Sequence, residues 1–433
     1  MYFTSHDIQA RRARLAAKWN AILKNDEAVL VHSGHPLQKP GGLDQTYPFL
    51  PHPAYYWLTG RRREGEVLLY NPAAGWIEFQ TPFTKEQAVW EGEKNDLLVQ
   101  VPGRDASELT AYVQQEKFTA AYDLGQTSNY KAEGKAFELN TAMDVVRRVK
   151  DAAEVAMIRG IADIANAGYR AIVETLRPGI TEKELHIAYE SAIYRAGAQT
   201  VPYESIVGSG PNAAILHALP TQRVIGEGEL VLVDAGADVL DYCVDITRTY
   251  ASSPSVNDRQ KALYDLVLKV QLACIDMCRP GNWWRDVHNT AAHMFTEGLK
   301  ELGILKGELS TLLEKEVVAL FFPHGLGHLV GLRVRDVGHA ENLSPKTYFG
   351  ARLRVDIQLE AGHLITVEPG LYFIDALLND PEKHTAFKED VDWNELAHWK
   401  GLGGVRIEDN LLITEGGPDN LTSVVDKAAG LVS

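Results

Sequence analysis

The first 150 residues alternate between helix-like and strand-like patterns of hydrophobic and polar positions. The helix-like stretches are 6–24, 105–117 and 132–149, and the strand-like stretches are 26–34, 64–72, 75–83 and 119–125. Asn71, Pro72 and Gly75 supply the turn chemistry of a hairpin between the second and third strands. Strands interleaved with helices predict an α/β domain over residues 1–150. This domain carries no glycine-rich phosphate loop and no nucleophile elbow in its sequence.

Near Lys150 the pattern changes to long helices around short strands. Helices are predicted over 152–176, from a Thr181–Glu184 capping box to about 196, over about 256–278 and over 284–302. Strand-like segments lie between and after these helices. Helices outside and antiparallel strands inside predict an α+β domain over residues 151–433.

The segment ELVLVDAGADVLDYCVDITRTY alternates apolar and polar positions on both arms of a predicted β-hairpin. A turn centred between Val239 and Leu240 would put Asp234 directly opposite Asp245, with Cβ atoms about 4.5–5.5 Å apart. Carboxylates this close repel each other unless a proton or a cation lies between them. The pair therefore indicates the floor of a metal site. The alternative is two solvated acids near a turn, and the later motifs argue against it.

Three later motifs add candidate ligands. In FFPHGLGHLVGL, a proline and two glycines disfavour a helix, but an extended chain still puts His324 and His328 on one face, and the glycines permit a close backbone approach. In HLITVEPGLYF and GGVRIEDNLLI, Glu368 and Glu408 alternate with apolar residues. Each residue alone has an ordinary structural explanation. Four carboxylates and one imidazole together suit Mn²⁺, Co²⁺, Fe²⁺ or Zn²⁺. Five protein ligands are about the number that two metal ions sharing bridging carboxylates would need.

Composition narrows the class of partner. The chain of 433 residues has a formal net charge of -15, which argues against binding to nucleic acid or to an anionic membrane surface. Its start lacks the apolar region of an export signal, and no uncharged run is long enough to span a membrane. Cys243, Cys274 and Cys278 cannot all pair, which favours reduced, buried thiols. We therefore expect a cytoplasmic protein that acts on small substrates.

The motifs VDAGADVLDYCVDITR, PHGLGHLVGL, TVEPGLY and GGVRIEDN, in this order and spacing, resemble the pita-bread metallopeptidases of the prolidase and aminopeptidase P group. The resemblance covers residues 150–425. The first 150 residues resemble the smaller N-terminal α/β domain of that group, through YYWLTG among other features. The insertion before the Glu368 strand and the segment 374–400 resemble bacterial Xaa-Pro dipeptidases most.

The resemblance implies a dinuclear metal centre. Its five ligands match Asp234, Asp245, His328, Glu368 and Glu408, with Asp245 and Glu408 as the bridges. Two divalent ions per subunit are expected, Mn²⁺ foremost, with Co²⁺ or Zn²⁺ as alternatives. Glu368 is the expected group to take and pass a proton.

The resemblance also implies the substrate contacts. His217 and His324 match two histidines that contact substrate and stabilise the tetrahedral intermediate. Tyr203 matches a tyrosine beside a metal-binding aspartate, and Arg406 holds a supporting position near the last ligand. Arg354 matches an arginine that in dipeptidases holds the free carboxylate of the substrate.

One position departs from the family pattern. The string GLRVRD has Arg335 where the family usually carries a third histidine, and Arg333 replaces a residue upstream. A guanidinium only donates hydrogen bonds and stays cationic, whereas an imidazole can also accept. Arg335 is expected either to bind a substrate carboxylate or the charge developing on the scissile carbonyl, or to turn away into a salt bridge.

The predicted activity is hydrolysis of the bond preceding proline in Xaa-Pro dipeptides by a metal-bridged hydroxide, in a homodimer. An Xaa-Pro aminopeptidase acting on longer peptides is the main alternative, because it has the same ligands. Metal-free proteins resembling creatinase, or binding modules resembling histone chaperones, fit poorly because the ligand set is complete. A methionine aminopeptidase would not need the first 150 residues, and hydrolysis of organophosphate esters is a conceivable side activity.

Overall fold

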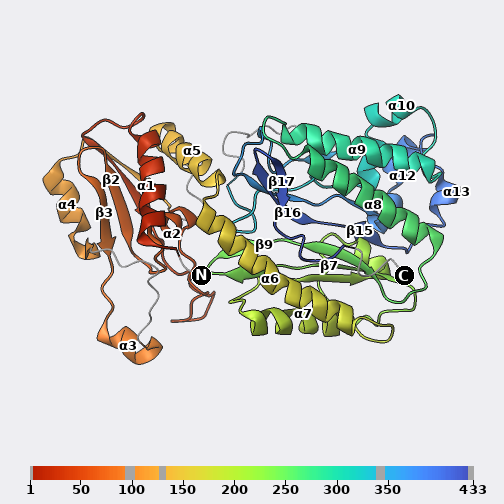
Figure 1. The fold of residues 1–433 in the computed structure, drawn as a ribbon, viewed down its shortest axis with the longest axis horizontal. Helices are drawn as coiled ribbons and strands as arrows, with labels where there is room; N and C mark the ends of the chain where they lie inside the picture. The colour runs from red at the N-terminus through yellow and green to blue at the C-terminus, as the bar shows by residue number, and fades with distance from the viewer. Residues whose placement is uncertain (1–2, 93–102, 126–132, 338–346, 428–433) are drawn as a thin grey trace. The chain divides into compact units, whose positions relative to one another are not determined.

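The computed structural model describes residues 3–92, 103–125, 133–337 and 347–427 (Figure 1). The chain divides into two compact units, Met1–Arg147 and Arg148–Ser433. Both units mix helix and strand, so the predicted fold class is confirmed. Among the described residues, none of the helices combines the length and the apolar character needed to cross a bilayer.

The N-terminal unit contains a five-stranded mixed sheet with the order β4-β3-β2-β1-β5. Its strands are β1 (Glu27–His32), β2 (Val67–Asn71), β3 (Gly75–Gln80), β4 (Arg104–Asp105) and β5 (Ala120–Leu124). Strands β1, β2 and β3 pair antiparallel, whereas β5 runs parallel to β1, and β4 runs parallel to β3.

The helices of this unit are α1 (Ser5–Trp19), α2 (Pro53–Thr59), α3 (Lys85–Glu91), α4 (Leu109–Glu116) and α5 (Gly134–Arg148). Helix α2 was missed by the sequence pattern, which predicts neither a helix nor a strand between residues 34 and 64. All but its first residue are buried, so it has no exposed polar face to reveal a helical period. Ala132, where the last helix of this domain was predicted to begin, lies outside the described residues.

The C-terminal unit places its long helices on both sides of antiparallel strands (Figure 1). Helix α6 (Ala152–Thr175) packs with α7 (Glu182–Ala196), and α8 (Asp258–Met277) packs with α9 (Trp284–Glu301). The capping box predicted at the start of α7 is present, because the Thr181 side chain accepts from the Glu184 amide and Glu184 accepts from the Thr181 amide. Shorter helices are α10 (Leu309–Glu314), α11 (Asp375–Leu378), α12 (Pro381–Ala386) and α13 (Trp393–Leu396).

The strands of the C-terminal unit form several small sheets rather than one large one. One three-stranded sheet has the order β10 (Thr247–Ala251), β7 (Leu230–Asp234) and β6 (Ile206–Ser209). The other has the order β13 (Leu364–Val367), β16 (Asp409–Thr414) and β17 (Gly417–Asn420). The pairs are β8 (Ala237–Val239) with β9 (Tyr242–Val244), β14 (Gly370–Tyr372) with β15 (Gly404–Arg406), and β11 (Thr347–Tyr348) with β12 (Ala351–Arg352). A bridge between Thr247 and Glu408 connects β10 to the start of β16.

The register of the central hairpin differs from the predicted one. The turn consists of Leu240 and Asp241, which both have positive φ, 55° and 67°, as a two-residue hairpin turn with primed geometry requires. The turn thus lies one position later than predicted, and Asp234 pairs with Thr247 instead of Asp245. Asp245 is a diagonal neighbour of Asp234, so the two carboxylates still share one side of the sheet.

Candidate metal centre and active site

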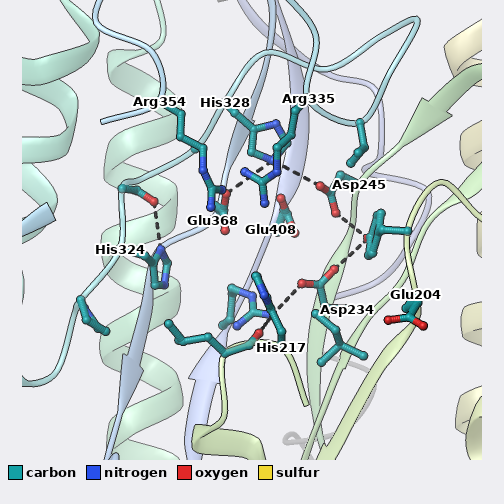
Figure 2. Close-up of a pocket in the computed structure, with 18 of the residues that line it drawn as sticks. Glu204, His217, Asp234, Asp245, His324, His328, Arg335, Arg354, Glu368 and Glu408 are labelled. Atoms are coloured by element: carbon teal, nitrogen blue, oxygen red, sulfur yellow. Dashed lines mark hydrogen bonds and ion pairs between the residues drawn. The ribbon is translucent and has the colours of Figure 1, made fainter. Parts of the chain in front are cut away.

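All the site residues predicted from the sequence line one cavity of about 480 Å³ in the C-terminal unit. Figure 2 shows their side chains converging from strands and loops on several sides of the space. Leu216, Leu219 and Val334 add apolar surface, and Glu204 and Arg352 add charges that were not predicted. The structure therefore brings the predicted side chains together at one cavity.

Backbone pairing brings the aspartates and Glu408 together. Asp234 ends β7 and Asp245 follows β9, while Thr247 pairs with Asp234 on one side and forms a bridge to Glu408 on the other. The Thr247 hydroxyl also donates to Glu408 Oε2 over 2.7 Å. Asn410 fixes the Asp245 backbone, because its side chain accepts from the Asp245 amide and donates to the Asp245 carbonyl. Three separate segments are thus held in one arrangement by strand pairing and side-chain bonds.

The histidine segment approaches β13 closely. The His328 amide donates to the Thr366 hydroxyl over 3.0 Å, and the Thr366 amide donates to the His328 carbonyl over 2.8 Å. A Cβ atom at position 327 would lie 2.1 Å from the Thr366 carbonyl oxygen, so glycine is required there. The predicted close backbone approach is confirmed at Gly327 but not at Gly325, where the nearest atom to an added Cβ would lie 3.4 Å away, an ordinary contact distance.

Asp245, His328 and Glu408 each present one ligand atom within 4.8 Å of the others. His328 Nδ1 faces the Leu329 carbonyl at 3.1 Å, and since a carbonyl only accepts, Nδ1 carries the proton. Nε2 lies 3.3 Å from Asp245 Oδ2 and 3.7 Å from Glu368 Oε1, and it is the ring nitrogen that would bind a cation placed among these acids. This triad has the chemistry of a divalent metal site.

Asp234 is linked to the triad through Tyr203. The Tyr203 hydroxyl lies 2.7 Å from Asp234 Oδ1 and 2.5 Å from Asp245 Oδ1, and Arg406 Nη2 donates to Asp234 Oδ2 over 2.6 Å. A hydroxyl has one proton to donate, so it cannot satisfy both carboxylates at once. Positive charge between the two aspartates would relieve this conflict.

The electrostatics of the cavity favour cations. Burial raises the pKa of Asp234 and Glu408, and it raises the pKa of Glu368 to about 7; neighbouring carboxylates add to each shift. Burial also acts to raise the pKa of Asp245, but its hydrogen bond to His328 and the charge of His328 bring the net pKa below the ordinary value. Glu408 Oε1 is buried and has no hydrogen-bond partner among the residues that the structure describes. Divalent cations fit this set of crowded oxygen donors, because they would neutralise the charge and bind the orphaned oxygen.

His324 belongs to a hydrogen-bonded chain. Arg406 Nη1 donates to the Tyr372 hydroxyl over 2.9 Å, and Tyr372 lies 2.8 Å from His324 Nε2, while His324 Nδ1 faces the Gly325 carbonyl at 2.9 Å. The carbonyl fixes the proton on Nδ1, so Nε2 accepts from Tyr372. Burial lowers the pKa of His324 to about 3, and the ring is therefore neutral. Tyr372 was not predicted as a site residue. It follows Glu368 within the TVEPGLY motif, at a position whose side chain would fall on the same side of an extended chain.

His217 is exposed at the cavity on a loop that a buried carboxylate holds at both ends. Glu182 accepts from the Ser209 amide and hydroxyl, from Asn212 Nδ2, and from the amide and hydroxyl of Thr221. Five hydrogen bonds to one carboxylate fix where the loop leaves and rejoins the fold. No local sequence pattern predicts this anchor.

The chain belongs to metallopeptidase family M24, whose family model matches residues 156–415. The family model for the aminopeptidase P N-terminal domain matches residues 8–100. The protein is therefore a hydrolase of a family that uses divalent metal ions, with an N-terminal aminopeptidase P domain and a C-terminal pita-bread domain.

Relatives and solved structures are similar over almost the whole chain. A probable Xaa-Pro aminopeptidase of Fusarium vanettenii is 34% identical over 90% of this chain and 89% of its own length. One of Podospora anserina is 33% identical over 93% and 91%. Zinc-substituted aminopeptidase P of Escherichia coli in complex with product has a TM-score of 0.80 at 25% identity, covering 99% of this chain and 97% of that one. Proline aminopeptidase P II of Yersinia pestis has a TM-score of 0.78 at 26% identity, covering 99% and 98%.

These comparisons favour the alternative over the main prediction. The relatives and structures named above are aminopeptidases, and none supports the predicted likeness to bacterial dipeptidases in particular. Segment 374–400, on which that likeness partly rested, forms short helices α11–α13 in the structure. The dipeptidase prediction relied on such insertions, which vary more readily than a metal site does.

Proposed function

We propose that the protein is a metal-dependent Xaa-Pro aminopeptidase, which releases the first residue of a peptide whose second residue is proline. The observation that carries the proposal is the Asp245–His328–Glu408 donor triad, buried at the cavity described above, in a chain whose relatives are named Xaa-Pro aminopeptidases. The cavity of about 480 Å³ falls in the size range of small-ligand sites and has charged groups on its walls that could orient a short peptide.

The proposed ligands of two divalent ions are Asp234, Asp245, His328, Glu368 and Glu408. Asp245, His328 and Glu408, whose ligand atoms lie within 4.8 Å of one another, would form the centre of this set. When bound, such ions lower the pKa of water and polarise a carbonyl oxygen. We propose Mn²⁺ as the ion, with Co²⁺ and Zn²⁺ as alternatives, because oxygen ligands predominate.

Glu368 is the proposed proton carrier. Its carboxylate lines the cavity and can accept a proton from a water molecule there, and the resulting carboxylic acid can return that proton. Its carboxylate lies 3.7 Å from His328 Nε2, at the edge of the triad. Glu368 would receive a proton from the attacking water and deliver it to the nitrogen of the departing proline.

His217 and His324 are the proposed contacts to the substrate carbonyl. In the present arrangement His324 is neutral, and its Nε2 accepts from Tyr372. Donation from His324 to the developing oxyanion therefore requires either the other tautomer or a different ring orientation once the substrate binds. The Tyr372 hydroxyl, held by Arg406, is available to stabilise either orientation.

The test is hydrolysis of matched peptides by the purified protein with Mn²⁺, Co²⁺ or Zn²⁺. We expect release of alanine from Ala-Pro-Ala and none from Ala-Ala-Ala. Asp245→Asn should lose bound metal and at least about 100-fold in kcat/KM, because several kcal/mol of transition-state stabilisation come from the metals. Glu389→Gln changes an exposed acid in the same manner and serves as the control.

Three outcomes would contradict the proposal. They are full activity after removal of metal, equal cleavage of Ala-Ala-Ala, and retention of metal and activity by Asp245→Asn. Cleavage of Ala-Pro without cleavage of Ala-Pro-Ala would instead establish a dipeptidase.

A further inference from the structure

A two-residue turn supports one wall of the cavity. Strands β11 and β12 are joined by Phe349 and Gly350. Arg352, in β12, and Arg354, just after it, line the cavity, and Figure 2 shows Arg354 extending toward the carboxylates there. The position of these two arginine side chains therefore depends on how the turn is held.

The turn has a backbone conformation that phenylalanine rarely adopts. Phe349 and Gly350 both have positive φ, 49° and 74°, as a two-residue hairpin turn with primed geometry requires. Glycine adopts this region freely, whereas a bulky residue is found there only where surrounding contacts stabilise it. We therefore expect stabilising contacts to reach this turn from another part of the chain.

Glu316 supplies these contacts. Its Oε1 accepts from the Phe349 amide and its Oε2 accepts from the Gly350 amide, each over 3.0 Å. Successive amides in a turn form a concave site for an anion, and the Glu316 carboxylate occupies this one. Since no described cation forms an ion pair with Glu316, the turn amides are the groups that hold its charge.

Glu316 also begins the segment that leads to His324. It precedes the 3₁₀ helix Val317–Leu320. The turn packs closely on this helix, since a Cβ atom at position 350 would lie 2.7 Å from the Ala319 Cβ. One carboxylate thus joins the cavity wall that carries the two arginines to the segment that carries a proposed substrate contact.

Two further contacts keep the hairpin attached on either side of the turn. His288 Nε2 donates to the Tyr348 carbonyl over 3.0 Å, because a carbonyl only accepts. Arg285 Nε donates to Asp356 Oδ1 over 2.7 Å. Loss of the Glu316 carboxylate should therefore shift the turn without detaching the hairpin from the fold.

We propose that Glu316 is a positioning residue for peptide binding, which places the side chains of Arg352 and Arg354 in the cavity by holding the turn before them. This inference rests on the proposed function and adds a residue that is not among those lining the cavity. Its hydrogen bonds go to the turn and not to a proposed metal ligand. A displacement of about 1 Å in a binding site can cost up to about 100-fold in activity, so a shifted turn should weaken peptide binding.

The first experiment compares two substitutions of Glu316. Glu316→Ala removes both acceptors and should raise KM for Ala-Pro-Ala by about tenfold, with kcat within about twofold and bound metal unchanged. Glu316→Gln keeps one carbonyl acceptor and should recover part of this loss. Glu314→Ala removes an exposed acid two positions earlier and should leave KM and kcat unchanged.

A double-mutant cycle tests whether Glu316 acts through the arginines. In protein that already carries Arg352→Ala and Arg354→Ala, Glu316→Ala should raise KM by less than about twofold, since the side chains that it places are gone. A purely structural role would instead lower the unfolding temperature and raise KM equally in both backgrounds. If Glu316→Ala does not fold, the same cycle with Glu316→Gln decides.

The inference is overturned by an unchanged KM, by an equal rise of KM in both backgrounds, or by loss of bound metal in step with activity. Each of these results leaves the proposed function intact, because the unsubstituted protein still cleaves Ala-Pro-Ala. Absence of that cleavage by the unsubstituted protein with every metal would overturn both.

Discussion

Glu408 and Asp409 are sequence neighbours and both are buried, but their pKa values are shifted in opposite directions. Glu408 faces the cavity, where burial and three other carboxylates hold its pKa well above the ordinary range, and within the described ranges of the chain its Oε1 has no hydrogen-bond partner. Asp409 also experiences burial, but the charges of Arg248 and Lys427 outweigh it and lower its pKa. Adjacent residues of an extended chain point to opposite sides, so one carboxylate enters each environment.

The difference separates a structural acid from a functional one. Asp409 is bonded by Arg248 Nη2 at 2.7 Å, Lys427 Nζ at 2.6 Å, Gln271 Nε2 at 2.9 Å and the Thr422 hydroxyl at 2.9 Å. The protein thus supplies every cation that this acid needs. Glu408 is instead surrounded by other acids, and a bound metal would supply the positive charge that they lack.

The largest expected effect concerns Asp409. Asp409→Asn leaves the buried Arg248 without its carboxylate partner, and removal of one member of a buried pair costs about 3–5 kcal/mol. We expect a clear fall in the temperature and denaturant concentration at which the C-terminal unit unfolds. Metal content, measured well below the unfolding temperature, should change little. An unaltered unfolding transition would show that this acid is not a structural anchor.

Glu408→Gln should give the reverse result. Activity should fall by at least about 100-fold because a proposed metal ligand is lost. The metal-free protein should be at least as stable as before, since the substitution removes one of several crowded acids. Elemental analysis, turnover of Ala-Pro-Ala and thermal unfolding in chelator measure these three quantities. A metal-free variant much less stable than the parent would contradict the comparison.

A smaller effect is expected in the pH dependence of stability. The pKa of Glu368 is about 7 in the fold against 4.5 as its ordinary value, so the metal-free folded state binds more protons between these values. Its free energy of unfolding should therefore fall as pH rises from about 4.5 to about 7. Asp409, whose pKa is lowered, contributes stability above its ordinary value of 3.8 that is lost as pH falls below it.

Unfolding temperatures across this pH range, with chelator and with Mn²⁺, check this prediction. Bound metal should flatten the decline, because the carboxylates are then deprotonated at every pH in the range. Identical profiles with and without metal would argue that the cavity acids do not hold the ion.

Local patterns predicted much of the fold. The long helices of the C-terminal unit, the strand at Glu27–His32 and the Thr181–Glu184 capping box depend on contacts within a few residues, so periodicity and cap chemistry reveal them. The residues predicted from the family motifs likewise line one cavity. The missed helix Pro53–Thr59 shows the limit, because a fully buried short helix lacks a polar face.

The sequence by itself determined which side chains are available and in which order they come. Tertiary structure decided the register of the hairpin and the environments of Glu408 and Asp409. It also decided that, among the described residues, Arg333 and not Arg335 forms an ion pair, and that His324 Nε2 accepts a hydrogen bond. Each of these depends on groups distant in sequence, as when the Thr247 hydroxyl bonds Glu408 across 161 positions. Such contacts leave no local pattern in the sequence. The intervening chain allows the two residues to meet, but it does not determine which of their atoms make contact.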